Sequence, residues 1–95
     1  MTDTAVIVHQ MPVFKKAYKK LHQHQKQLIQ QAIQTIIATP DIGEVKRGDL
    51  AGVYVYKFKL DQREMSLAYE WDPKRRLLLA LGVHENFYRD LKKRL

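Results

Sequence analysis

Lys57 and Lys59 are the residues whose type and spacing best suit chemistry, because they lie two positions apart in a predicted strand over residues 53–60. Side chains alternate along a strand, so both ammonium groups lie on one face, roughly 6.5–7 Å apart. The other face is apolar and is expected to pack on the core: Tyr54, Tyr56, Phe58 and Leu60. Two cations on the outer face of a rigid sheet predict a phosphate-binding site, with an ordinary solvated sheet face as the alternative.

Further candidates for the same site follow in the next two predicted strands. Arg63 lies in a predicted turn, and Glu64 begins the strand after it, where its carboxylate is either a general base or an ion-pair partner. Arg75 and Arg76 precede the last predicted strand. If these strands form an antiparallel meander, we expect the arginines to converge with the two lysines on one basic surface.

His84 follows the last predicted strand and opens a predicted helix over residues 85–95. An imidazole exchanges protons near neutral pH, and a strand-to-helix junction holds it rigidly while leaving it accessible. Tyr88 lies four residues further, one turn along the same helix face. The alternatives are a helix-entry histidine with local hydrogen bonds and a tyrosine packed into the core.

Charge and composition limit the partners of the protein. The 95 residues carry a net charge of +7, which favours a polyanionic partner such as RNA, DNA, the ribosome or an acidic protein. The sequence has no cysteine, so disulfide and thiolate chemistry is excluded, which suits a cytoplasmic protein. The N-terminus has no signal-peptide pattern, and the apolar runs are too short to span a membrane.

Neither a metal nor a cofactor is expected. His22 and His24 are two positions apart, so they diverge on a helix instead of forming the i, i+4 pair of a zinc-binding helix. No cysteine completes a metal site, and the sequence contains no Gly-rich phosphate loop.

The elements that would position these residues form one α+β domain over residues 1–95. Residues 5–8 predict a short strand, Pro12 begins a helical segment and Pro40 closes it. A single helix over that segment would be about 42 Å long, too long for a globule whose radius of gyration is about 12–13 Å. We therefore predict a helical hairpin that turns at residues 22–25.

The second half of the chain predicts most of the sheet. Residues 41–50 are expected to form a loop. The later strands are predicted at residues 53–60, 64–71 and 77–81, with Gly82 ending the last one. The predicted fold is thus a short strand and a helical hairpin packed on an antiparallel sheet of about four strands, with a C-terminal helix.

Three strings of the sequence resemble, in their order and spacing, the RelE/ParE family of bacterial toxins from toxin–antitoxin pairs: residues 48–60, 67–69 and 81–88. The resemblance implies a fold related to small microbial ribonucleases. For RelE-type members it implies a metal-independent endoribonuclease that enters the ribosomal A site, cuts messenger RNA and blocks translation. In that reaction the ribose 2′-hydroxyl attacks the adjacent phosphate, which leaves a cyclic phosphate and a free 5′-hydroxyl.

The resemblance also implies roles for individual residues. Lys57 and Lys59 match strand lysines of the family, which suggests base or electrostatic roles. His84 matches the position of an arginine or histidine after the last strand and is the candidate acid. Tyr88 matches an aromatic residue that stacks on a base or orients the substrate.

One departure from the family pattern concerns Ser66, which stands where RelE-type members carry an arginine. A serine supplies no charge, so Arg63 is the candidate substitute. Glu64 lies nearer to the position at which His-bearing relatives place an acid. The chain therefore resembles the His-type nucleases more than the Arg-type nuclease.

Two other functions are open on the sequence alone. ParE-type members of the same fold bind and inhibit DNA gyrase without nuclease activity, and a basic RNA-binding module without toxicity is the third possibility. Either toxin predicts a cognate acidic antitoxin, which would contact the outer face of residues 15–20 and the closing helix.

Overall fold

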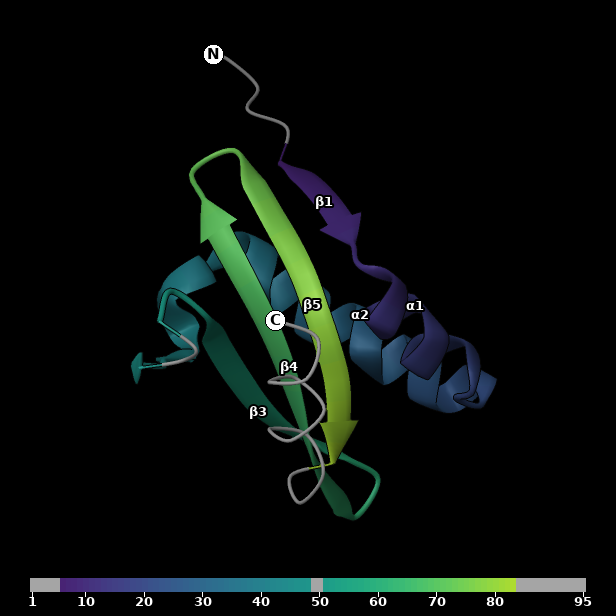
Figure 1. The fold of residues 1–95 in the computed structure, drawn as a ribbon. Coiled ribbons are helices and arrows are strands. Elements are labelled where there is room, and N and C mark those ends of the chain that lie inside the picture. The colour runs from purple at the N-terminus through teal and green to yellow at the C-terminus, as the bar shows by residue number, and fades with distance from the viewer. Residues whose placement is uncertain (1–5, 49–50, 84–95) are drawn as a thin grey trace.

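The computed structural model describes residues 6–48 and 51–83. The predicted C-terminal helix, with His84 and Tyr88, lies outside the described residues. In chain order the described elements are β1 (Ile7–Gln10), α1 (Pro12–Lys19), α2 (Gln23–Ala38), the short 3₁₀ helix η1 (Pro40–Ile42), β2 (Glu44–Val45), β3 (Tyr54–Leu60), β4 (Arg63–Asp72) and β5 (Arg75–Val83). Figure 1 shows their arrangement around a twisted sheet.

The helical hairpin is confirmed, with its turn slightly earlier than predicted. Pro12 takes the first position of α1, where its missing N–H costs no hydrogen bond. The second helix begins at Gln23, and the backbone N–H of His22 donates to Oε1 of Gln25 at 3.1 Å. This side-chain contact satisfies one of the backbone groups at the start of α2 and so fixes where the helix begins.

The sheet has five strands in the order β1-β5-β4-β3-β2, and β3, β4 and β5 form the predicted antiparallel meander. It is a mixed sheet rather than a wholly antiparallel one, because β1 pairs with β5 in parallel. No tight turn joins these two strands, so their relative direction is set by the route of the chain through both helices. The predicted loop also supplies an extra edge strand, β2, which pairs with the start of β3.

The strand β5 continues beyond the predicted end at Gly82. Gly82 pairs with Ser66 and Val83 pairs with Met65, so the ladder to β4 runs to the end of the described chain. A glycine weakens a strand without removing its backbone hydrogen bonds, which explains why it does not end this one.

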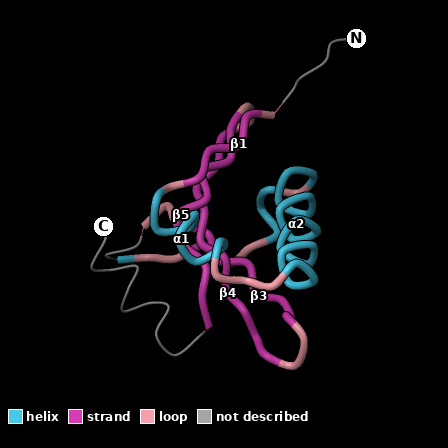
Figure 2. The backbone as a smooth tube through the Cα atoms, turned by 90° about the vertical axis from the view of Figure 1, so that its right-hand side faces the viewer, coloured by secondary structure: helices cyan, strands magenta, loops and turns pink. Residues whose placement is uncertain are grey.

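The predicted aromatic face of β3 packs against the helical core. Figure 2 shows α2 lying along one face of the sheet. Alternate residues of β3, β4 and β5 meet the apolar side of α2 there. The fully buried members of this core are Phe14, Ile29, Ile36, Leu67, Tyr69 and Leu78. A second, smaller cluster lies on the outer face, so β5 is apolar on both sides as predicted: Val53, Val55, Ala68, Leu79 and Ala80.

The hydroxyl of Tyr69 fixes the segment that follows α2. It accepts a hydrogen bond from the backbone N–H of Gly43 at 3.0 Å and donates one to the carbonyl of Pro40 at 2.7 Å. A Cβ at Gly43 would lie 2.7 Å from that hydroxyl oxygen, which explains the glycine. Burial raises the pKa of Tyr69, although the hydrogen bond from Gly43 acts in the opposite direction.

In the described part of the chain, no helix is long and apolar enough to cross a membrane.

Candidate functional site

Lys57 and Lys59 are both exposed and, by alternation along β3, lie on the face opposite Phe58 and Leu60. Lys59 also borders a small pocket that residues of α2 line. Their neighbours on the same strand, Phe58 and Leu60, pack against the helical core and hold the backbone in place. The two cations are therefore mounted on a rigid strand and remain accessible to solvent. An anion such as a phosphodiester can approach this face without displacing the core.

Lys57 belongs to a row of three residues across the sheet. It pairs with Ser66 of β4, which in turn pairs with Gly82 of β5. Ser66 is fully buried, and its hydroxyl has no hydrogen-bond partner within residues 6–48 and 51–83. The sequence singled out Ser66 only because RelE-type toxins carry an arginine at this position. Alternation along β4 is the sequence signal that Ser66 shares a face with Lys57.

Lys59 lies opposite Glu64, two positions beyond the pair of Lys57 and Ser66 toward the end of the sheet. Both side chains are exposed, and no ion pair between them is formed among the residues that the structure describes. The carboxylate of Glu64 is thus available beside two ammonium groups. The pairing of β3 with β4 places Lys57, Lys59 and Glu64 on one face of the sheet.

Arg63 does not share this face. The turn consists of Asp61, which has a left-handed φ of 58°, and Gln62, whereas Arg63 begins β4 opposite Leu60. Alternation along β4 places Arg63 on the side of Met65, toward the helices. Arg63 therefore does not substitute for a cation at Ser66, and the prediction that it lies in the turn is wrong.

The same turn is tied to the start of α2 by Asp61. One carboxylate oxygen of Asp61 lies 3.2 Å from Nε2 of His24, and the other accepts a hydrogen bond from Nε2 of Gln25 at 3.2 Å. These contacts join the end of the β3–β4 hairpin to the helical layer. They support the position of Lys59 and Glu64, which flank the turn.

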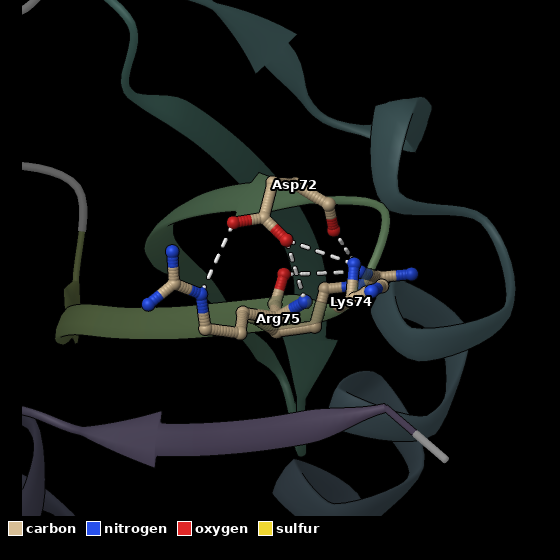
Figure 3. A network of polar contacts seen from close by, with 4 residues as sticks. Asp72, Lys74 and Arg75 are labelled. Atoms are coloured by element: carbon tan, nitrogen blue, oxygen red, sulfur yellow. Dashed lines mark hydrogen bonds and ion pairs between the residues drawn. The ribbon is translucent and has the colours of Figure 1, made fainter. Parts of the chain in front are cut away.

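Arg75 and Arg76 lie at the opposite end of the sheet. Arg75 pairs with Asp72, six residues along β4 from Ser66, which corresponds to a separation of roughly 20 Å. The guanidinium of Arg75 donates to Asp72 at 3.1 Å, as Figure 3 shows. The predicted convergence of these arginines with Lys57 and Lys59 does not occur, because the lengths of β4 and β5 keep the two ends apart.

Arg76 is only 4% exposed and serves the fold. Its guanidinium donates to the carbonyls of Ile36 and Ile37 at the end of α2, at 3.2 and 2.9 Å, and also to the carbonyls of Asp72 and Arg75. The Arg76 guanidinium lies 5.7 Å from the ring centroid of Trp71. We therefore do not retain Arg76 as a substrate-binding residue.

The backbone N–H of Lys74 donates to Asp72 and, with the Arg75 contacts, holds the pKa of that carboxyl below its usual range. This tight network belongs to the β4–β5 turn (Figure 3). It leaves Arg75 as an exposed cation that is already paired.

Comparison with known proteins supports the fold described above. The structure of a mutant of the E. coli toxin RelE in the free state is similar to this chain, with a TM-score of 0.72. The two sequences are 19% identical, and the match covers 96% of this chain and 98% of the RelE chain. The intact E. coli RelBE toxin–antitoxin complex gives 20% identity and a TM-score of 0.66, over 85% and 99% of the two chains. A YoeB/ParE toxin from Agrobacterium tumefaciens gives 16% and 0.66, over 83% and 99%.

Among proteins with curated descriptions, none matches the sequence. The sequence profile of the ParE-like toxins of type II bacterial toxin–antitoxin systems, in contrast, matches residues 8–92, which is nearly the whole chain. The chain therefore belongs to the ParE-like toxins of type II toxin–antitoxin systems.

Proposed function

We propose that this toxin is an mRNA interferase, a metal-independent endoribonuclease that cuts messenger RNA on the ribosome and is neutralised by an acidic antitoxin. The observation that carries the proposal is the group formed by Lys57, Lys59 and Glu64 on the outer face of the sheet. A protein that acts only by docking does not need two cations and a carboxylate fixed together at this spacing.

The proposed reaction uses the 2′-hydroxyl of the RNA as its nucleophile. Glu64 accepts the proton of that hydroxyl while the 2′-oxygen bonds to phosphorus, and Lys57 and Lys59 stabilise the extra negative charge of the phosphorane. The bond from phosphorus to the 5′-oxygen then breaks. His84, which follows β5 directly in the sequence, gives its proton to the leaving 5′-oxygen.

Ser66 adds no charge to this scheme. It occupies the middle of the row between Lys57 and Gly82 and is fully buried, so its hydroxyl is not exposed to a phosphate on the outer face. A hydroxyl carries no charge, so the two lysines supply the electrostatic stabilisation that an arginine would otherwise share. Tyr88 is proposed to stack on a base of the substrate, and Arg75 to contact RNA outside the reacting site.

Primer extension on translated messenger RNA, after induction of the toxin, tests the proposal. We expect cleavage sites to appear with the wild type and to fall by about 10²-fold or more in Lys57→Ala and in His84→Ala, because each change removes a group that acts in the transition state. Lys74→Ala is the matched control, since it removes an exposed lysine at the far end of the sheet. Undiminished cleavage by folded Lys57→Ala would remove that residue from the mechanism.

Inhibition of DNA gyrase is the second candidate function. The matched profile is that of ParE-like toxins, and one similar structure is described as a YoeB/ParE toxin. A gyrase inhibitor would block supercoiling by purified gyrase and would leave messenger RNA intact. The supercoiling assay, run beside primer extension, therefore separates the two functions.

A further inference from the structure

An apolar pocket opens between the end of α1 and the end of the sheet at which β5 finishes. Its volume is about 340 Å³, and its apolar lining includes Ala17, Leu21, Leu60 and Leu81. The pocket is on the helix side of the sheet, so it is separate from the face that carries Lys57 and Lys59. A hollow of this size accepts a large apolar side chain of a partner.

Two cations border this apolar pocket. Lys20 comes from the end of α1 and Arg63 from the start of β4, and both are exposed. Within the described ranges, neither side chain forms an ion pair. A partner that places an apolar side chain in the pocket would therefore gain most if carboxylates flanked that side chain.

We propose that this pocket is the anchor site for the antitoxin, which inserts one large apolar side chain between Lys20 and Arg63. Charge complementarity identifies the occupant, because a toxin of net charge +7 is expected to pair with an acidic antitoxin. A second copy of this basic chain would bring further lysines and arginines toward Lys20 and Arg63, so self-association is disfavoured.

The position of the pocket also accounts for neutralisation. Gly82 lines the pocket and pairs with Ser66, which is the neighbour of Lys57 across the sheet. An antitoxin anchored here sits at the same end of the sheet as the proposed reacting site, on the opposite face. From that anchor its chain can continue over the edge of β5 and cover the lysines.

The test uses the cognate acidic antitoxin, which a neighbouring reading frame is expected to encode. Ala17→Leu fills the pocket without changing charge, and Ala17→Ser is its control because it leaves the volume nearly unchanged. Lys20→Glu reverses one cation of the border, with Lys74→Glu as the control of equal charge change at the far end of the sheet. None of these three positions belongs to the proposed reaction.

We expect Ala17→Leu and Lys20→Glu to raise the dissociation constant of the purified complex by about tenfold or more, because each removes part of an anchor contact. The two controls should change it by less than about threefold. In cells, both test variants should still arrest growth when produced alone and should escape neutralisation when the antitoxin is co-produced.

Wild-type affinity in folded Ala17→Leu would overturn the proposal, as would equal effects of Lys20→Glu and Lys74→Glu. If Ala17→Leu fails to fold, the exposed Lys20→Glu and its control decide the question. Sedimentation of the same variants measures self-association. Variants that self-associate more weakly but still bind the antitoxin would assign the pocket to a second copy and would also overturn the proposal. The inference rests on the toxin–antitoxin assignment and not on RNA cleavage, so the two can fail independently.

Discussion

Tyr69 joins the sheet to the segment after α2 through a single hydroxyl. That hydroxyl serves both Gly43 and Pro40, so its loss leaves a backbone N–H and a carbonyl without partners in a partly buried place. We predict that Tyr69→Phe lowers the free energy of unfolding by about 1–3 kcal/mol. Urea denaturation measures this, with Tyr54→Phe as the control.

Tyr54 is a suitable control because it lies on the same face and packs on Tyr69, with ring centroids 5.7 Å apart. Its hydroxyl makes no hydrogen bond within the part of the chain that the structure describes. A change of less than about 0.5 kcal/mol is expected for Tyr54→Phe. Equal effects of the two substitutions would mean that the Tyr69 hydrogen bonds do not stabilise the fold.

Asp72 makes the free energy of unfolding depend on pH in the acid range. The N–H of Lys74 and the contacts of Arg75 lower the pKa of Asp72 in the folded state below its ordinary value of 3.8. A carboxyl with a lowered folded pKa adds stability above its unfolded pKa and loses it as the pH falls through the folded value. We predict that Asp72→Asn reduces the loss of unfolding free energy between about pH 5 and pH 3.

Urea titrations at a series of pH values measure that slope for the wild type and the variant. Asparagine keeps an oxygen that can accept from Lys74, so the turn itself is retained. Identical slopes would show that Asp72 does not contribute to the acid dependence.

At the scale of elements, the end of α2 depends on a residue from β5. The carbonyls of Ile36 and Ile37 receive hydrogen bonds from the guanidinium of Arg76, which is buried beneath them. We predict that Arg76→Met lowers the free energy of unfolding by about 2–3 kcal/mol, because carbonyls at a helix end lose charged donors.

Arg75→Met is the matched control for that substitution. Arg75 is the neighbouring residue, and its side chain is 63% exposed, so its ion pair with Asp72 should contribute less than about 1 kcal/mol. Thermal or urea unfolding of both variants makes the comparison. A smaller effect for Arg76→Met than for Arg75→Met would contradict the role given to Arg76.

The periodicity of the sequence predicts some elements well. The alternation from Tyr54 to Leu60 identifies β3 and its buried face, and Pro12 and Pro40 mark the limits of the helical hairpin. The strand β2 has no such signal, because its two residues acquire their conformation from pairing with Val55 and Tyr54. The parallel pairing of β1 with β5 is also invisible to periodicity, since it depends on contacts between distant parts of the chain.

At the scale of the whole molecule, the sheet register decides which predicted site residues meet. Lys57, Lys59 and Glu64 lie on adjacent strands of one hairpin, so their shared face follows from local alternation. Arg76 was expected among them because it is basic and lies near a turn. Its burial under the end of α2 is a tertiary contact with a helix 39–40 residues away in the sequence, which no local pattern predicts.

The proposed reaction and the proposed antitoxin binding use opposite faces of the sheet. The outer face at one end of the sheet carries the proposed reacting group, and the helix side at the same end carries the anchor pocket. Substitutions in the pocket are therefore expected to affect neutralisation while leaving growth arrest intact.

Cleavage of a defined messenger on purified ribosomes tests the central claim most directly. The claim is that Lys57, Lys59 and Glu64 promote attack by a 2′-hydroxyl, so a messenger with a single 2′-deoxyribose at the cleavage position should resist the toxin completely. The unmodified messenger should yield a cyclic phosphate and a free 5′-hydroxyl in the presence of a metal chelator that leaves the ribosomes intact. Cleavage at the deoxy position, or no cleavage of either messenger, would contradict this account.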